Sequence, residues 1–151
     1  MPFVKVYIHF VFCTKNRFPH LNSRDLRENV WDHIRKNAKK KDIFIDTVNG
    51  YQEHCHCIIS MGIDQTMSKI MQLIKGESSY WINKNQFCKQ KFAWQDEYFA
   101  VSISESDLET VRKYLWTQEE HHKHKSFNEE FDAYIKKHGF QKFKDGSIAK
   151  E

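Results

Sequence analysis

The segment that most restricts the fold of this chain is residues 4–14, VKVYIHFVFCT. It is dominated by β-branched and aromatic residues, a composition typical of a strand that is buried on both faces. A strand of that kind lies in the interior of a sheet. We therefore expect residues 4–14 to form a central strand, with the other strands of the chain on either side of it.

The segments that follow alternate between helical and strand patterns. After Ser23, which is the expected N-cap, apolar residues recur at helical spacing. The dipeptide Asn49-Gly50 is typical of a hairpin and joins the short apolar runs 42–50 and 54–62, so we expect two antiparallel strands there. The other predicted elements are a helix over 66–85 that contains one glycine, a strand over 98–104, a helix from Ser104 or Ser106 to about residue 123, and a helix over 126–139.

This order of elements predicts a particular α+β fold. Strand, helix, strand, strand, helix, strand is the ferredoxin-like order, which RRM-like nucleic-acid-binding modules share. We expect an antiparallel sheet with helices on one face, followed by a further C-terminal helix. In such a sheet the first and third strands are central neighbours, which leaves a helix-free face beside residues 54–62 for a ligand. The fold by itself does not determine function, because it carries many functions.

The length and composition of the chain bound its organisation. With 151 residues we expect a single domain over 1–151, in which residues from about 140 to 151 form a C-terminal tail. No stretch has the length of an apolar membrane span and the first residues show no leader pattern, so we expect a cytoplasmic protein. The four cysteines lack the spacing of a disulfide framework or a zinc site, and we expect free thiols.

Charge is unevenly distributed along the sequence. Residues 1–42 hold ten Lys and Arg against four Asp and Glu, and residues 65–92 hold five lysines and one glutamate, whereas residues 95–110 hold five acids and no base. The folded chain is therefore expected to have a basic side and an acidic side. A phosphate-bearing partner suits the basic side, and an unevenly charged surface without such a partner explains the pattern equally well.

The strand predicted over 54–62 begins with two histidines one residue apart. Side chains at positions i and i+2 of a strand share a face, so His54 and His56 project together while Cys55 and Cys57 project to the other face. Two neighbouring imidazoles supply half of a metal site. A pair of hydrogen-bonded structural histidines is the alternative, and a third ligand is needed to decide between them.

Two groups further along the chain are candidates for that ligand. The histidines of the EEHHKH run at 119–124 lack the spacing of a helical metalloprotease site, and a solvated helix end with cations near its C-terminal dipole explains them. Tyr114 and Gln118 are four residues apart, so they share one face of the predicted helix and bring a phenol and an amide oxygen to one cleft. From the residues alone, the favoured interpretation is that Tyr114 extends the apolar stripe of Leu108, Val111 and Leu115.

One family resemblance spans nearly the whole chain. It is carried by HFVFCTKNRFPHL near the start, the His54-Cys55-His56 motif, and then LIKGESSYWINK, WQDEYFAVSIS and VRKYLWTQEEHH. In this order these segments resemble the IS200/IS605-type transposases, which are single-tyrosine HUH enzymes that move single-stranded DNA. The resemblance implies a ferredoxin-like domain with a C-terminal helix that bears the nucleophilic tyrosine.

Residue by residue, the resemblance implies that Tyr114 is the nucleophile and that His54, His56 and Gln118 bind one divalent cation. Two imidazoles and an amide oxygen leave coordination positions open for phosphate oxygens and water, which suits Mg²⁺ or Mn²⁺ better than a structural zinc. The cation would polarise the scissile phosphate. Attack by Tyr114 would give a 5′-phosphotyrosine and a free 3′-hydroxyl, and a second 3′-hydroxyl would then rejoin the strand.

The family also implies its partners. These are DNA hairpins near the element ends and a second copy of the chain, in a homodimer where the tyrosine helix of one subunit completes the metal site of the other. Phosphate donors and stacking side chains on the basic segments are the expected DNA contacts. They are Thr14, Lys15, Arg17, Lys75, Ser78, Ser79, Trp81 and Lys84.

Three other functions stay open at this point. A ferredoxin-like module that binds single strands without cutting them would need neither Tyr114 nor Gln118. A metal-dependent phosphoesterase would use the same histidines with water as the nucleophile. A monomeric, cis-acting HUH nuclease would keep Tyr114 in the site of its own chain. A covalent DNA adduct mapped to one tyrosine excludes the first two.

Overall fold

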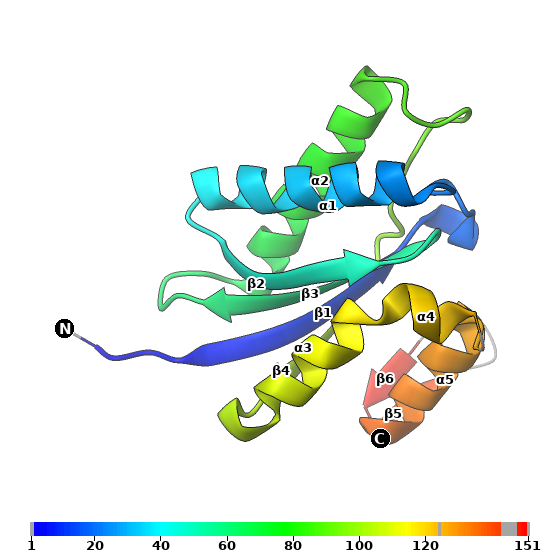
Figure 1. The fold of residues 1–151 in the computed structure, drawn as a ribbon. Helices are drawn as coiled ribbons and strands as arrows, with labels where there is room; N and C mark the ends of the chain where they lie inside the picture. Colours follow the sequence, from blue (N-terminus) through cyan, green and yellow to red (C-terminus); the bar gives the residue numbers. More distant parts are fainter. Residues whose placement is uncertain (1, 124, 143–147, 151) are drawn as a thin grey trace. The chain divides into compact units, whose positions relative to one another are not determined.

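The computed structural model describes residues 2–123, 125–142 and 148–150 (Figure 1). The expected single domain over 1–151 corresponds here to two compact units, Met1–Gln118 and Glu119–Glu151, and each is described by itself. The first unit contains β1 (Val6–Cys13), the 3-10 turn η1 (Lys15–Arg17), α1 (Arg24–Lys40), β2 (Phe44–Gly50), β3 (His54–Met61), α2 (Met67–Lys84), β4 (Phe99–Ile103), the 3-10 turn η2 (Glu105–Asp107) and α3 (Leu108–Trp116), and α4 (Gln118–His122) begins at its last residue.

The sheet of the first unit has the order β2-β3-β1-β4. Every neighbouring pair is antiparallel, and β1 and β3 are the central strands. β1 takes this place because its apolar residues are buried on both faces, with Phe10 and Val11 as examples on opposite sides. The predicted ferredoxin-like α+β fold is therefore confirmed.

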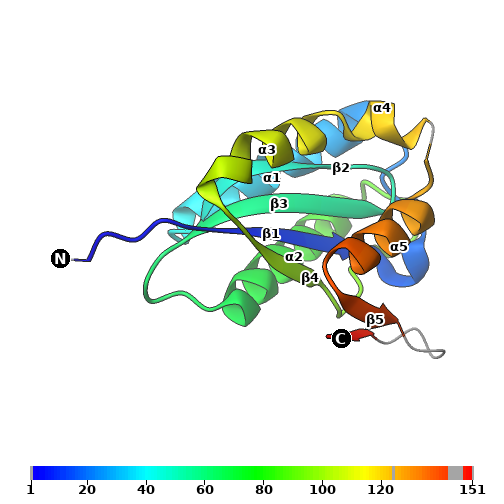
Figure 2. The ribbon, with the colours of Figure 1, turned by 90° about the horizontal axis from the view of Figure 1, so that it is seen from below.

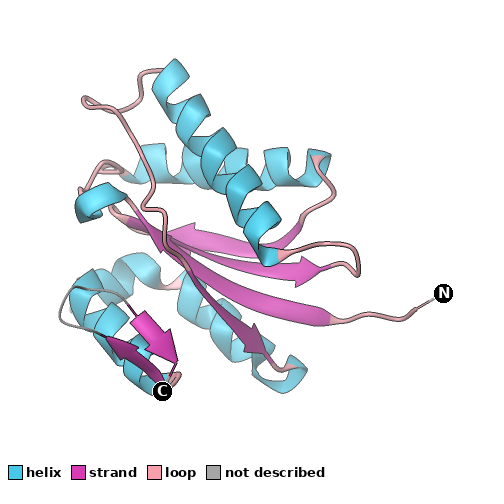
Figure 3. Ribbon diagram, turned by 180° about the vertical axis from the view of Figure 1, so that it is seen from behind, coloured by secondary structure: helices cyan, strands magenta, loops and turns pink. Residues whose placement is uncertain are grey.

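Helices α1 and α2 cover one face of this sheet (Figures 1 and 3). Alternate residues of the central strands point to them, so Phe10 and Phe12 of β1 share the core with Cys55 and Cys57 of β3. The four cysteines are free, as expected, and the Cys55 and Cys57 Sγ atoms lie 3.7 Å apart in the core. Ser23 caps α1 as predicted, because its Oγ accepts a hydrogen bond from the Leu26 amide at 3.1 Å.

Helix α3 packs on the opposite face, where it lies against β2 and β3 (Figure 2). Its buried residues Leu108 and Leu115 form a small apolar cluster with Ile58 of β3. The expectation of a helix-free face is therefore wrong. A helix with apolar residues on one side must cover an apolar surface, and the sheet face around Ile58 provides one.

The β2–β3 turn differs from the one that the sequence predicts. Asn49 and Gly50 do not form the turn, because both still belong to β2 and pair with His56 and Cys55. The connection consists of residues 51–53 instead. Gly50 is needed for close approach, since a Cβ at this position would lie 2.1 Å from the carbonyl oxygen of His54. Asn49 connects β2 to α3, because its Nδ2 donates a hydrogen bond to the Leu115 carbonyl at 2.7 Å.

The helix predicted to continue to about residue 123 is interrupted at Thr117. Thr117 is the C-cap of α3 with φ −103° and ψ 21°, and α4 starts at the next residue. Its hydroxyl donates to the carbonyls of Lys113 and Tyr114, at 3.1 and 3.3 Å, where the helical ladder ends. Tyr114 and Gln118 therefore belong to two helices and do not lie on one continuous helical face, contrary to the prediction.

The second unit contains α5 (Phe127–Lys137), β5 (Phe140–Lys142) and β6 (Ile148–Lys150). Ser126 caps α5 by accepting a hydrogen bond from the Glu129 amide at 3.2 Å, and Gly139 follows its C-cap with φ 71°, a conformation that glycine adopts readily. The predicted last helix is confirmed. In the segment expected as a tail, β5 and β6 pair antiparallel (Figure 3), while residues 143–147 and 151 lie outside the described part of the chain.

Candidate active site

The histidine pair lies where β3 begins, on the sheet face that α3 covers. His54 and His56 are almost fully buried, with exposed fractions of 0% and 1%. Alternation along β3 sends Cys55 and Cys57 to the opposite core, as predicted. The two imidazole rings meet edge to face, with centroids 5.0 Å apart. The strand therefore brings both imidazoles to one small site.

Both ring nitrogens of His54 face oxygen atoms. The Nδ1 atom lies 2.7 Å from a carboxylate oxygen of Glu53, and the Nε2 atom lies 3.0 Å from Oε1 of Gln118. A contact of 3.5 Å from Gln118 Nε2 to the Tyr114 carbonyl is consistent with this orientation of the amide. A neutral imidazole carries one proton and can donate to one acceptor only. The Nε2 atom of His54 and the Oε1 atom of Gln118 are thus also placed to bind one cation together.

His56 has a different partner, which sequence analysis did not identify. Its Nδ1 atom lies 2.9 Å from Nε2 of His9 on β1, and the two rings are stacked with centroids 5.1 Å apart. His9 is buried on the same sheet face as His56. The alternation of β1 is the signal that could have indicated it, because His9 stands two residues before Val11, which pairs with His56.

Nδ1 of each imidazole is thus hydrogen-bonded by a protein group, and Nε2 is the nitrogen suited to metal coordination. Proteins commonly hold metal-binding histidines in this way, with the second nitrogen bonded to a carboxylate or another polar group. Glu53 and His9 fill those positions for His54 and His56. Both imidazoles are consequently oriented by bonds that do not involve the ligand nitrogen.

Tyr114 reaches this site from α3. Its ring stands perpendicular to that of His56, with centroids 5.7 Å apart and an interplanar angle of 89°. Tyr114 is half-buried and borders the Ile58 cluster, so it belongs to the apolar stripe of the helix and also lies beside the histidine pair. The structure thus brings together four residues singled out from the sequence, namely His54, His56, Tyr114 and Gln118, within Met1–Gln118.

The family model of IS200-like transposases matches residues 3–118. The chain belongs to this transposase family. The matched residues coincide almost completely with the first compact unit, which holds the whole site described above. No curated protein matches the chain at a significant level.

Solved structures resemble the fold of this IS200-like chain. One is described as a "putative transposase" from Deinococcus radiodurans R1, with 16% identity and a TM-score of 0.62 over 78% of this chain and 93% of that one. Another is the REP-associated tyrosine transposase bound to a REP hairpin, with 19% identity and a TM-score of 0.60 over 81% of this chain and 72% of that one. At these identities the likeness concerns the fold.

Two of the residues expected to contact DNA in this transposase are buried. The Thr14 hydroxyl donates to the Phe18 carbonyl at 2.7 Å. The Ser78 hydroxyl donates to the Ile74 carbonyl at 2.6 Å and accepts a bond from Trp94 Nε1 at 2.9 Å. A DNA contact through either hydroxyl would first require these bonds to break. Both side chains therefore stabilise the fold around η1 and α2.

The other expected DNA contacts lie nearer the surface. Trp81 stacks flat on His33, with ring centroids 3.8 Å apart. Lys75 donates to the Asp96 carbonyl at 2.8 Å and lies over the Tyr98 ring, and burial lowers its pKa from the ordinary value. Lys15 and Lys84 are exposed, whereas Arg17 and Ser79 are half-buried. The contacts of Trp81 and Lys75 are thus with His33, Asp96 and Tyr98.

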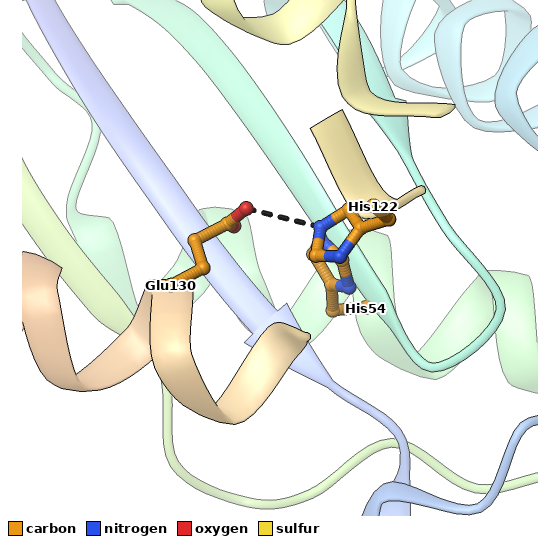
Figure 4. Close-up of side chains that lie close together, drawn as sticks. All are labelled: His54, His122 and Glu130. Carbon is orange, nitrogen blue, oxygen red and sulfur yellow. Dashed lines mark ion pairs between the residues drawn. The ribbon is translucent and has the colours of Figure 1, made fainter. Parts of the chain in front are cut away.

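The EEHHKH run contributes histidines to an ion-pair cluster within the second unit. His121 and His122 each place Nε2 3.0 Å from the same oxygen of the buried Glu130, and Figure 4 shows the ion pair between His122 and Glu130. These ion pairs link α4 to α5. His124, the third histidine of the run, lies outside the described residues.

Among the residues that the structure describes, none of the helices combines the length and the apolar character that crossing a membrane requires.

Proposed function

We propose that this chain is a transposase for single-stranded DNA in which Tyr114 is the nucleophile. The observation that carries the proposal is the position of Tyr114, whose ring lies edge-on to His56 beside His54 and Gln118. Family membership supports the same reaction class. A plain binding module has no use for a phenol beside two oriented imidazoles and a buried amide.

The described residues fit one divalent cation. His54 and His56 would bind the cation through Nε2, and Gln118 would bind it through Oε1. The His54 Nε2 and Gln118 Oε1 atoms lie 3.0 Å apart, and each can offer a lone pair to a metal ion. This donor set leaves open positions and suits Mg²⁺ or Mn²⁺. When bound, the cation would offset the charge that develops on the scissile phosphate.

The proposed reaction needs no further co-substrate. Tyr114 Oη forms a bond to phosphorus and loses its proton, the bond from phosphorus to the 3′ oxygen breaks, and that oxygen leaves as a 3′-hydroxyl. The product is a 5′-phosphotyrosine, which another 3′-hydroxyl can attack to seal the strand and release Tyr114. Glu53 and His9 keep His54 and His56 oriented throughout.

We further propose that Tyr114 acts in the site of its own chain. The family resemblance implies a homodimer with exchanged tyrosine helices, but here α3 packs on the sheet that carries its own histidine pair. This packing favours the cis-acting form of the enzyme. As partners we propose DNA hairpins, in keeping with the hairpin-bound relative.

The other tyrosines are poorer candidates for the nucleophile. Burial and the neighbouring Glu130 raise the pKa of Tyr134 far above its ordinary value, which disfavours the phenolate. Tyr98 is about one-third exposed and lies under Lys75, and its ring contacts Phe10 rather than either metal-binding histidine. Tyr98 is nevertheless the next candidate if Tyr114 fails.

A covalent-trapping experiment tests the proposal. The protein is incubated with Mn²⁺ and a library of 3′-labelled single-stranded oligonucleotides that contain hairpins, since the label stays on the protein in a 5′-phosphotyrosine adduct. We expect a labelled adduct that maps to Tyr114 by mass spectrometry. Tyr114→Phe should form no adduct and should bind hairpins with an affinity within about twofold of the wild type, because only one oxygen is removed.

The matched control is Tyr80→Phe, which removes a hydroxyl from a tyrosine with an exposed fraction of 64% and should leave the adduct unchanged. Adduct formation by Tyr114→Phe would overturn the assignment and direct attention to Tyr98. Cleavage without any adduct in the wild type would indicate a phosphoesterase that uses water. Hairpin binding without cleavage would indicate a non-catalytic module.

A further inference from the structure

The tyrosine helix is connected to β2 by a pair of charge-assisted hydrogen bonds. Arg112 of α3 donates from Nε to Oδ1 of Asp46 at 2.9 Å and from Nη2 to Oδ2 at 2.6 Å. A guanidinium and a carboxylate that share two parallel bonds fix both distance and orientation. Arg112 is therefore held in one geometry on the sheet, and Tyr114 follows it by two residues.

A local irregularity of β2 accompanies this contact. The pairing of β2 with β3 shifts between Ile45 and Thr47, so Asp46 is the additional residue of a β-bulge. Bulges change the direction of a side chain and are common near active sites. The Thr47 hydroxyl donates to Asp46 Oδ1 at 2.7 Å, which holds the carboxylate from the strand side. The strand thus orients Asp46 without any contribution from α3.

A second contact holds the other end of the helix. Asn49 of β2 donates from Nδ2 to the Leu115 carbonyl at 2.7 Å, in the last turn of α3, where carbonyls lack partners within the helix. Asn49 pairs with His56 across the β2–β3 ladder. The two contacts therefore lie on either side of Tyr114 in sequence, at Arg112 and at Leu115.

These contacts matter because the other contacts of α3 with the sheet are mainly apolar. It has nine residues, fewer than an isolated helix needs for stability in water, and its buried residues are Leu108 and Leu115. Apolar contacts favour burial but do not specify rotation about the helix axis as strictly as paired hydrogen bonds do. The orientation of Tyr114 thus depends strongly on the contacts with β2.

We propose that Asp46 and Arg112 are positioning residues, which place Tyr114 beside His56 of the same chain for attack on the phosphate. The proposal rests on the proposed function of Tyr114 and adds the residues that fix its position. Displacement of a reacting group by about 1 Å can slow a reaction about a hundredfold, so loss of this anchor should slow cleavage without removing a catalytic group. The pair is charged at neutral pH, because Arg112 lowers the pKa of Asp46 below its ordinary value.

The test compares Asp46→Asn with Glu109→Gln. Asp46→Asn keeps the shape of the side chain but removes its charge and one acceptor oxygen. Glu109→Gln is the matched control, since Glu109 also contacts Arg112, at 3.1 Å, but belongs to α3 itself and cannot connect the helix to the sheet. The readouts are hydrogen exchange of residues 108–116, hairpin affinity, and the rate of adduct formation.

With Asp46→Asn we expect amides of α3 to exchange about tenfold faster, while those of α1 are unchanged, because the opening is local. Adduct formation should slow about tenfold or more at unchanged hairpin affinity. Glu109→Gln should resemble the wild type in every readout. This combination is not expected from a purely structural role, which would alter exchange across the whole unit.

The proposal is overturned if α3 of Asp46→Asn exchanges as in the wild type, or if exchange rises and adduct formation does not change. If Asp46→Asn does not fold, Arg112→Lys supplies the same comparison, because lysine keeps the charge but cannot form two parallel bonds. Absence of any adduct in the wild type refutes the proposed function instead, and the exchange data still decide whether Asp46 anchors α3.

Discussion

Replacing Gly50 with alanine tests whether tight packing at the end of β2 determines the position of His54. The new Cβ would lie 2.1 Å from the His54 carbonyl oxygen and 3.0 Å from both the Cys55 Cα and the Trp31 Cζ2. Real Cβ contacts are essentially never shorter than 3.0 Å, so the carbonyl has to retreat by roughly 0.9 Å. The obstructing atom belongs to the backbone and cannot rotate away as a side chain would.

The energetic effect follows from this displacement. Overpacking of a well-packed site costs about 1–3 kcal/mol, and we expect the upper part of that range because the backbone of a central strand must move. For a chain of this size that loss lowers the Tm by about 5–10 °C. His54 moves with its carbonyl, so the affinity for Mn²⁺ should fall about tenfold to a hundredfold, as it does when support of a metal ligand is lost.

Thermal unfolding and calorimetric titration with Mn²⁺ measure the two effects. Gly76→Ala is the matched control, because a Cβ there meets no atom within 4 Å in the middle of α2. That substitution should stabilise the protein by about 0.5–1 kcal/mol and leave Mn²⁺ binding unchanged. A Gly50→Ala protein with the stability and the Mn²⁺ affinity of the wild type would refute the reasoning.

Two further experiments concern the metal and the assembly of the site. The double variant His54→Ala, His56→Ala lacks both imidazoles, so it should lose high-affinity Mn²⁺ binding in calorimetry and should not cleave DNA. Unchanged Mn²⁺ binding would exclude this pair as the metal site and make the His121 and His122 cluster the next candidate. Mixing a Tyr114→Phe protein with the double-histidine variant should give no cleavage if α3 stays on its own sheet. Restored cleavage, in subunits shown by labelling to exchange, would instead establish sites shared between subunits.

The architecture was predictable from the sequence because helices and strands differ in the spacing of their apolar residues and because the helices carry capping residues. The apolar segment that became β1, the cap at Ser23 and the apolar repeat of α2 each depend on local chemistry, and each was found where expected. The turn at residues 51–53 was missed because Asn49-Gly50 is a strong local hairpin signal. Here a tertiary contact, Asn49 to Leu115, gives the asparagine a role that local sequence cannot show.

The four residues that meet at the candidate site were predictable from the sequence, and the groups around them were not. His54 and His56 follow from strand alternation, whereas Tyr114 and Gln118 were interpreted through a continuous helix that in fact ends at Thr117. The two side chains still reach the site because the chain turns back toward β3 after α3. His9 and Asp46 could not be identified, since their roles depend on which strands and helices become neighbours.

The division of β3 into a histidine face and a cysteine face makes the enzyme sensitive to the length of its loops. A slip of one residue along β1 would exchange the faces, so that imidazoles entered the apolar core and thiols replaced them beside Tyr114. Such a slip would abolish folding and chemistry together. Insertions or deletions near residues 51–53 are therefore tolerable only when they leave the register of β3 on β1 unchanged. Among related sequences, changes in the length of this loop should be rarer than substitutions within it.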